Sequence, residues 1–206
     1  MKKLTTRNIA KAVRGRNTLV RLICMAILAV CTLLETNAAK YTEKELWINN
    51  GARRIYGVLA SPEGRSGRLP VAIIAHGFNG DHKFGRNYFD TLCALGYRCY
   101  TFDFPCGSTK SRSDANTMNM SVKDEESDIK AIVRHFMTSD DTDTTGIVLI
   151  GESQGGLVVA LAAADLRDKV SRLVLVYPAL CIPDNWNSKY KNESDIPDTT
   201  RVWGVP

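Results

Sequence analysis

The residues with the clearest potential for chemistry lie at 151–155, where "GESQG" fits the G-x-S-x-G pattern. In that pattern a serine nucleophile is held on a tight turn between a strand and a helix. The context agrees, because the apolar run Ile147–Ile150 precedes the serine and helix-forming residues follow it. We therefore predict that Ser153 is the nucleophile of a covalent mechanism, and that Gly151 and Gly155 relieve crowding in the turn.

Two other interpretations of this stretch are open at the level of sequence. Ser153 could cap a helix in an ordinary strand-to-helix turn, or the glycines could cradle a phosphate group. The order G-x-x-x-G-G matches neither the G-x-G-x-x-G dinucleotide pattern nor a P-loop with its Lys-Ser/Thr pair. The pattern therefore favours the nucleophile over nucleotide binding.

A second candidate stretch is "HGFNG" at 76–80, which follows another apolar run. Ester hydrolysis passes through a tetrahedral oxyanion that backbone N–H groups stabilise. We predict that the N–H groups of Phe78 and Gln154 form this oxyanion hole, and that His76 and Gly77 support the turn. A histidine at a strand end before such a turn more often bonds the loop backbone, so His76 is a poor candidate for the catalytic base.

Strand and helix signals alternate around these motifs. Alternating apolar residues flank Asn50-Gly51, the strongest short hairpin signal, so two antiparallel strands are expected within 45–62. Further strands are expected at 71–78, 97–104, 147–150 and 171–177, and helices at 87–95, 122–137 and 155–166. The fold class is therefore α/β, a mostly parallel sheet with an antiparallel start and no second domain. The segment after Pro178 shows no periodicity.

Acidic residues and cysteines give no sign of a metal site. Ser121 suits the N-cap of the expected helix, and Asp124, Glu125 and Glu126 suit the positive end of its dipole. We interpret these acids as a solvated helix start. After the leader, the cysteines follow no metal-ligand spacing and are expected as buried free thiols: Cys93, Cys99, Cys106 and Cys181.

The positive charge of the chain is concentrated at its beginning. Residues 1–38 hold seven of the 27 Lys/Arg and one of the 22 Asp/Glu, so the formal charge of +5 becomes −1 for the remainder. This distribution argues against nucleic acid as a partner.

The first 38 residues have the pattern of an export signal. A basic segment precedes the uncharged run 22–34, and small residues suitable for cleavage follow. Thirteen helical residues rise about 20 Å, short of the roughly 30 Å of a bilayer core. We expect a signal peptide at 1–38, a domain at 39–206, and export to the periplasm or medium without stable membrane association after cleavage. An uncleaved anchor and a lipoprotein-type signal at Cys31 are the weaker alternatives.

The motifs "AHGFNGD", "YTFDFPCGS" and "LIGESQGG" occur in the order and spacing of the α/β-hydrolase family. The chain resembles its bacterial cinnamoyl or feruloyl esterases from about Lys44 to Pro206. The resemblance implies the α/β-hydrolase fold, the roles given above for Ser153 and the oxyanion donors, and a loop-ordering role for Asp103. The chain departs from the family pattern at Glu152, where relatives usually have histidine, and at 105–107, where they have R-G-x-G.

The resemblance also implies a triad in the chain order Ser…Asp…His. All three histidines, His76, His82 and His135, precede Ser153, and Asp184 is the only tolerable acid after it. We expect the family's acid and histidine to follow two further strands, so the fold is expected to be incomplete at the C-terminus, with the acid and base of the triad unknown. The alternatives are a non-catalytic acyl-binding protein and an unusual use of one of the three histidines.

The sequence thus predicts a serine hydrolase that cleaves carboxylic esters of acyl or hydroxycinnamoyl type through an acyl-serine intermediate. The expected partner is a small-molecule ester, and no cofactor or metal is predicted. One alternative is a serine peptidase of the same fold, similar to aminopeptidases. The other is a non-catalytic binding module or an inactive fragment. The oligomeric state is left open.

Overall fold

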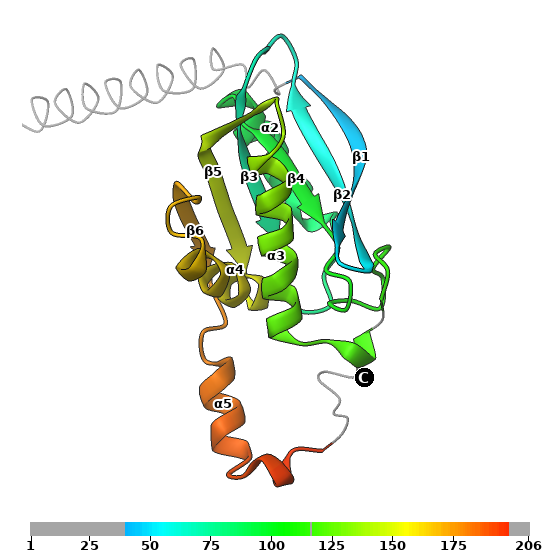
Figure 1. Cartoon of the computed structure of the whole chain (residues 1–206), viewed down its shortest axis with the longest axis vertical. Coiled ribbons are helices and arrows are strands. Elements are labelled where there is room, and N and C mark those ends of the chain that lie inside the picture. Colours follow the sequence, from blue (N-terminus) through cyan, green and yellow to red (C-terminus); the bar gives the residue numbers. More distant parts are fainter. Residues whose placement is uncertain (1–39, 116, 198–206) are drawn as a thin grey trace, which may run out of the picture. The chain divides into compact units, whose positions relative to one another are not determined.

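The computed structural model describes residues 40–115 and 117–197 (Figure 1). The signal peptide expected at 1–38 lies outside the described residues. The described residues contain no helix that is both long and apolar enough to span a membrane.

Six strands form one mixed sheet in the order β1-β2-β4-β3-β5-β6 (Figure 1). β1 and β4 both run antiparallel to β2, whereas β3 runs parallel to β4 and β5, and β5 runs parallel to β6. The sheet is therefore mostly parallel with an antiparallel start, as predicted. The strands are β1 Tyr41–Asn50, β2 Arg53–Pro62, β3 Leu69–Ala75, β4 Arg98–Phe102, β5 Thr142–Glu152 and β6 Arg172–Val176.

The hairpin predicted from Asn50-Gly51 is confirmed, although its two turn residues are Gly51 and Ala52, because Asn50 is the last paired residue of β1. Gly51 has a φ of 61°, a left-handed conformation that glycine adopts without a steric penalty. The register runs from Asn50 opposite Arg53 to Tyr41 opposite Pro62. The turn thus sets the pairing of ten residues in each strand.

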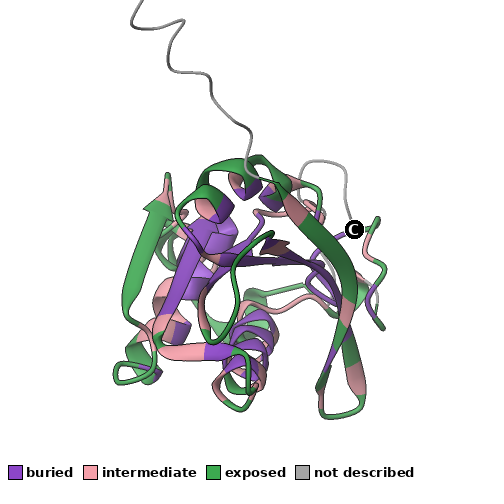
Figure 2. Cartoon of the chain, turned by 90° about the horizontal axis from the view of Figure 1, so that it is seen from above, coloured by how far each residue is buried: buried purple, intermediate pink, exposed green. Residues whose placement is uncertain are grey.

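The helices divide between the two faces of the sheet (Figure 1). Val71, Ile73 and Ala75 of β3 pack with α3 and α4, whereas the intervening Ala72 and Ile74 pack with α2. This alternation buries β3 on both faces, which explains why its sequence is continuously apolar. In Figure 2 the central strands are accordingly coloured as buried. The helices are α2 Phe89–Ala94, α3 Val122–Met137, α4 Gln154–Asp165 and α5 Ile182–Lys189, with short 3-10 turns at Phe84–Tyr88, Thr117–Asn119 and Glu193–Asp195.

α3 has the bounds that its sequence predicts. The Ser121 hydroxyl accepts a hydrogen bond from the Lys123 N–H at 3.1 Å and so caps the helix. Ile129, Ile132 and Phe136 form an apolar stripe at helical spacing and are fully buried.

Two helical segments differ from the predictions. The helix expected at 87–95 begins as the 3-10 turn Phe84–Tyr88 and becomes α-helical only at Phe89. α5 was missed, because its eight residues offer only one apolar i,i+4 pair, Ile182 and Trp186, too few to establish a period.

The cysteines are free thiols over the described residues. Cys93, Cys99 and Cys106 are buried, as expected, and Cys93 and Cys99 lie side by side with their sulfur atoms 3.9 Å apart. For Cys181 the expected burial is wrong, because this residue is exposed at the start of α5.

β6 is an edge strand of the sheet over the described residues. Leu173, Val174 and Leu175 are between 37% and 43% exposed. Consecutive strand residues point to opposite faces, so both faces of β6 are open in this part of the chain.

Phe136 tests the packing of α3 on the sheet. Its ring is fully buried and packs edge-on against Tyr100 at a centroid distance of 5.4 Å. We expect Phe136→Ala to lower the free energy of unfolding by about 3–5 kcal/mol, because it removes a large buried side chain and leaves a cavity. Leu95→Ala is the matched control, since Leu95 is 68% exposed, and should change the free energy by less than about 0.5 kcal/mol. Urea denaturation measures both, and equal effects would contradict this core assignment.

Candidate active site

The carboxyl ends of β3, β4, β5 and β6 lie at the same edge of the sheet, because these strands are parallel (Figure 1). The segments that follow them therefore converge. In open α/β sheets, ligands bind at this edge. All the site residues predicted from the sequence belong to the ends of β3 and β5 or to the residues just after them.

Ser153 occupies a strained turn between β5 and α4. Its φ of 51° and ψ of −120° are unusual for a residue with a side chain and cost on the order of 1–3 kcal/mol. Hydrogen bonds hold this conformation: the Ser153 N–H donates to the Val176 carbonyl at 3.1 Å, and its carbonyl accepts from the Ala179 N–H at 2.8 Å. β6 and the residues after it thus fix the turn.

The glycines of the motif permit contacts that no other residue would allow. A Cβ on Gly155 would lie 2.7 Å from the Ala75 carbonyl oxygen, so α4 starts directly against the end of β3. A Cβ on Gly151 would lie 2.8 Å from the Gly155 carbonyl carbon. Both glycines therefore have the steric role that the motif predicts.

The turn after β3 lies directly beside the serine. A Cβ on Gly77 would be 3.0 Å from Ser153 Cβ and 3.6 Å from Ser153 Oγ. The Asn79 N–H donates to the Gly107 carbonyl at 2.9 Å, and Asn79 Oδ1 accepts from the Thr109 N–H at 3.2 Å. The loop after β4 therefore holds this turn in place.

Two pockets meet at Ser153. The larger, of about 470 Å³, has mostly apolar walls, and its lining includes Ser153, Phe78 and Gln154. The other residues that line it are Met120, Val122, Ala179, Cys181, Ile182, Asn185 and Trp186. The smaller pocket, of about 250 Å³, is lined by His76, Gly77, Phe78, Gly80, Phe84, Glu152, Ser153 and Tyr177. The structure thus brings the predicted nucleophile and both predicted oxyanion donors to one cavity.

His76 bonds the loop backbone, as its position at a strand end predicts. Nδ1 lies 2.7 Å from the Gly77 carbonyl oxygen, and Nε2 accepts the Phe104 N–H at 3.2 Å. These partners require the proton on Nδ1. Burial lowers the pKa of His76, so the ring stays neutral. Both ring nitrogens are occupied, and His76 supports the turn instead of accepting a proton from Ser153.

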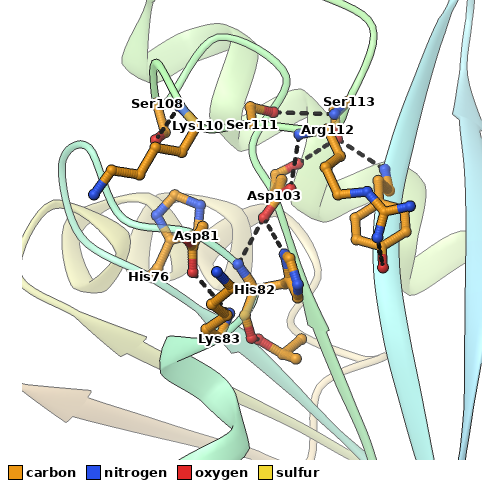
Figure 3. A network of polar contacts seen from close by, with 12 residues as sticks. His76, Asp81, His82, Lys83, Asp103, Ser108, Lys110, Ser111, Arg112 and Ser113 are labelled. Atoms are coloured by element: carbon orange, nitrogen blue, oxygen red, sulfur yellow. Dashed lines mark hydrogen bonds and ion pairs between the residues drawn. The ribbon is translucent and has the colours of Figure 1, made fainter.

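His82 and Asp103 form a buried network beneath the loops (Figure 3). Asp103 Oδ1 accepts from the His82 N–H at 2.6 Å and lies 2.9 Å from His82 Nδ1, while Oδ2 accepts from the Arg112 N–H at 2.8 Å. The Ser113 hydroxyl donates to the Asp103 carbonyl at 2.7 Å. Asp103 therefore ties together the loops after β3 and β4, in agreement with the role expected from the family resemblance.

Neither His135 nor Asp184 lines a pocket at Ser153. His135 is on α3, where its ring packs edge-on against Phe136, and burial lowers its pKa. Asp184 is exposed in the first turn of α5. Among the hydrogen bonds of the described residues, none joins a histidine ring to Ser153.

The interpretation of the acids at the start of α3 as solvated is wrong for Glu125 and Glu126. Glu125 is 2% exposed, and its Oε2 accepts from Gln154 Nε2 at 2.9 Å. Glu126 is buried between Lys123 and Lys130, whose Nζ atoms lie 2.9 and 2.6 Å from its carboxylate oxygens. The helical period contained the missed signal, because Glu125 lies four residues before Ile129 on the buried face of α3.

Burial controls the ionisation of Glu125. Desolvation raises its pKa to about 8, although the Gln154 hydrogen bond acts in the opposite direction. Glu152, which lines the smaller pocket, also has a pKa raised by burial. Its Oε2 is buried and has no hydrogen-bond partner among the described residues.

The architecture and the site motifs together define a class of protein. The family model described as the alpha/beta hydrolase fold matches residues 70–204, and the chain belongs to this family. The predicted fold class is therefore confirmed.

Solved structures of this fold include two of Est1E from Butyrivibrio proteoclasticus. The one with bound ferulic acid shares 28% identity, covers 78% of this chain and 66% of its own, and has a TM-score of 0.67. The other shares 25% identity over 79% of this chain and 64% of its own, with a TM-score of 0.65. A hypothetical protein, PA2218 from Pseudomonas aeruginosa, is similar in fold, with 22% identity over 69% of this chain and 46% of its own, and a TM-score of 0.59. The chain thus spans just under two thirds of the Est1E structures. No match was found among curated proteins.

Asp103→Asn tests the loop network. One oxygen of the buried carboxylate becomes an amide nitrogen that faces an N–H donor, of either His82 or Arg112. We expect a loss of about 2–3 kcal/mol in the free energy of unfolding and faster hydrogen exchange in both loops. Asp114→Asn is the control, because it removes the charge of an exposed ion pair with Arg54 and should cost less than about 1 kcal/mol. If Asp103→Asn behaves like the control, Asp103 does not order the loops.

The pH dependence of stability tests the burial of Glu125. Its folded-state pKa of about 8 lies above the usual 4.5, so the folded protein keeps a proton that the unfolded chain releases between about pH 5 and 8. The stability of the wild type should therefore fall relative to Glu125→Gln by about 1.4 kcal/mol per pH unit in this window. Urea denaturation at pH 5, 6.5 and 8 measures the difference. A constant difference would mean that the carboxyl is not desolvated.

Proposed function

We propose that this chain supplies the nucleophile and the oxyanion hole of a serine esterase. The observation that carries the proposal is Ser153 in its strained turn, lining the same pocket as Phe78 and Gln154. Membership of the α/β-hydrolase fold family and the similarity to Est1E support it.

In the proposed reaction, Ser153 Oγ attacks the acyl carbon of an ester and its proton passes to a base. The negative charge that develops on the carbonyl oxygen is stabilised by the backbone N–H groups of Phe78 and Gln154. The C–O bond to the alcohol then breaks, and water hydrolyses the acyl-serine. Gln154 is the first residue of α4, where a backbone N–H has no acceptor in a preceding turn.

The two pockets give the two sides of an ester a place beside the serine. The larger pocket has apolar walls that include Phe78, Met120 and Trp186, which suit a flat aromatic acyl group. Est1E has been solved with ferulic acid bound, which supports a hydroxycinnamoyl group or a similar acyl group as the occupant. The smaller pocket would then receive the alcohol side.

None of the three histidines has the contacts of the base. His76 has both ring nitrogens bonded, the His82 ring packs against Tyr56, and neither His82 nor His135 lines a pocket at Ser153. A serine without a base is a weak nucleophile, so the proposal predicts slow turnover by the 206-residue chain alone. Added imidazole can replace a missing base.

Ser153→Ala tests the proposal in the presence of imidazole. We expect imidazole to accelerate p-nitrophenol release from p-nitrophenyl acetate and ferulate at least about tenfold more for the wild type than for the variant. This acceleration should be smaller than the roughly 10²–10⁴-fold that a positioned base contributes. Ser66→Ala, in an exposed loop, is the matched control and should behave like the wild type.

Other outcomes would overturn the proposal in distinct ways. Equal rates for the wild type and Ser153→Ala, together with retained ferulate binding, would identify a non-catalytic binding protein. Cleavage of aminoacyl p-nitroanilides in preference to esters, dependent on Ser153, would identify a peptidase of the same fold.

A further inference from the structure

The side chain of Gln154 is held from two directions. Its Nε2 donates to Glu125 Oε2 at 2.9 Å and lies 3.7 Å from Met120 Sδ. Gln154 and Glu125 are 8% and 2% exposed, so the hydrogen bond between them is shielded from water. A shielded hydrogen bond to a carboxyl group restrains a side chain more strongly than one made in solvent.

The place of the Glu125 carboxyl is built by three segments. α3 supplies Glu125 itself, whose N–H donates to the Ser121 carbonyl at 3.0 Å, and α4 supplies Gln154. The loop after β4 supplies Gly107, where a Cβ would lie 2.9 Å from Glu125 Oε1. A larger residue at 107 would displace the carboxyl, so the fit is close on this side as well.

Gln154 is an important residue to restrain. It adjoins Ser153, whose φ of 51° leaves the turn under strain, and it begins α4. A small rotation of the peptide between Ser153 and Gln154 would swing the Gln154 N–H away from the substrate carbonyl, and the loss of one oxyanion donor costs a large factor in rate.

We propose that Glu125 is a positioning residue of the oxyanion hole, which holds the backbone N–H of Gln154 in place through the Gln154 side chain. The inference rests on the proposed function of Ser153, but it concerns a residue on another helix that the motif does not include. Glu125 touches neither the substrate pocket nor the reacting atoms, and so acts only through Gln154.

The charge of Glu125 matters to the same function. The charged groups that act on it are Asp124 and Asp128 of its own helix, while Gln154 and Gly107 of the other segments do not titrate. His76, whose ring lies against Gly107, has a pKa lowered by burial and stays neutral. With a pKa of about 8, Glu125 is mostly protonated at neutral pH. A carboxylate here would oppose the oxyanion across a low-dielectric interior.

Two substitutions separate geometry from charge. Glu125→Gln keeps an acceptor for the Gln154 amide and cannot ionise, whereas Glu125→Leu removes the acceptor and leaves a buried amide unpaired. Glu126→Gln is the matched control, because it changes the neighbouring carboxylate, which pairs with Lys123 and Lys130 instead of Gln154.

Nuclear magnetic resonance of the 206-residue chain tests the positioning without any need for turnover. In the wild type, the chemical shift of the Gln154 backbone amide should change with pH, with a midpoint near pH 8 as Glu125 ionises. In Glu125→Gln this chemical shift should stay near the value that the wild type has at neutral pH and should not change with pH. In Glu125→Leu the Gln154 amide should shift at every pH and exchange its hydrogen at least about tenfold faster, as expected for local opening. An unchanged Gln154 amide in a folded Glu125→Leu variant would overturn the inference, whether or not Ser153 is catalytic.

The rate of imidazole-assisted p-nitrophenyl ester hydrolysis, corrected for Ser153→Ala, tests the charge. The wild type and Glu126→Gln should be about tenfold slower at pH 9 than at pH 7, as the carboxyl ionises. Glu125→Gln should lack this decrease, and Glu125→Leu should be slow at every pH. If Glu125 had only a structural role, the pH profile of Glu125→Gln would be the same as that of the wild type, and this result would overturn the inference. A rate that does not depend on Ser153 would instead overturn the proposed function.

Discussion

The contact between the start of α4 and the end of β3 determines the rest of the site. Gly155 lies so close to the Ala75 carbonyl that no side chain fits between them, and this contact fixes where α4 begins. The residue before α4 must then turn sharply, and Ser153 does so with a positive φ. The turn at Gly77 lies beside this serine, since a Cβ added at Gly77 would be only 3.6 Å from Ser153 Oγ. Ser153 and the loop that carries Phe78 are therefore neighbours because two backbone segments pack without side chains between them.

Buried polar side chains hold the loops around this contact. Asp103 ties the loop after β3 to the loop after β4, and His76 bonds the backbone on both sides of its ring. Each of these groups has its hydrogen bonds satisfied, so each contributes rigidity instead of an unpaired polar group. Two of the three histidines of the chain, His76 and His82, thus belong to the framework of the site.

The sequence predicted those features that depend on local patterns. The hairpin turn follows from Asn50-Gly51, α3 follows from its cap and apolar stripe, and the elbow follows from its glycines. Features that depend on distant packing escaped prediction. The first turn of a helix is a place where acids are commonly solvated, and this expectation outweighed the helical period that puts Glu125 on the face of Ile129. The hydrogen bond from Gln154 of α4 shows what the buried carboxyl contacts. The helix α5 is likewise too short for its period to be recognised.

The burial of acids near Ser153 has an electrostatic consequence for the site as a whole. Glu125 accepts a hydrogen bond from the Gln154 side chain, and Glu152 lines the smaller pocket together with Ser153. Burial raises the pKa of both carboxyl groups. Desolvation thus acts in the direction that reduces negative charge around the turn, although the chain places two acids there. An oxyanion stabilised only by neutral N–H dipoles depends on such a reduction, because in a low-dielectric cavity a nearby carboxylate would cancel much of what the dipoles contribute.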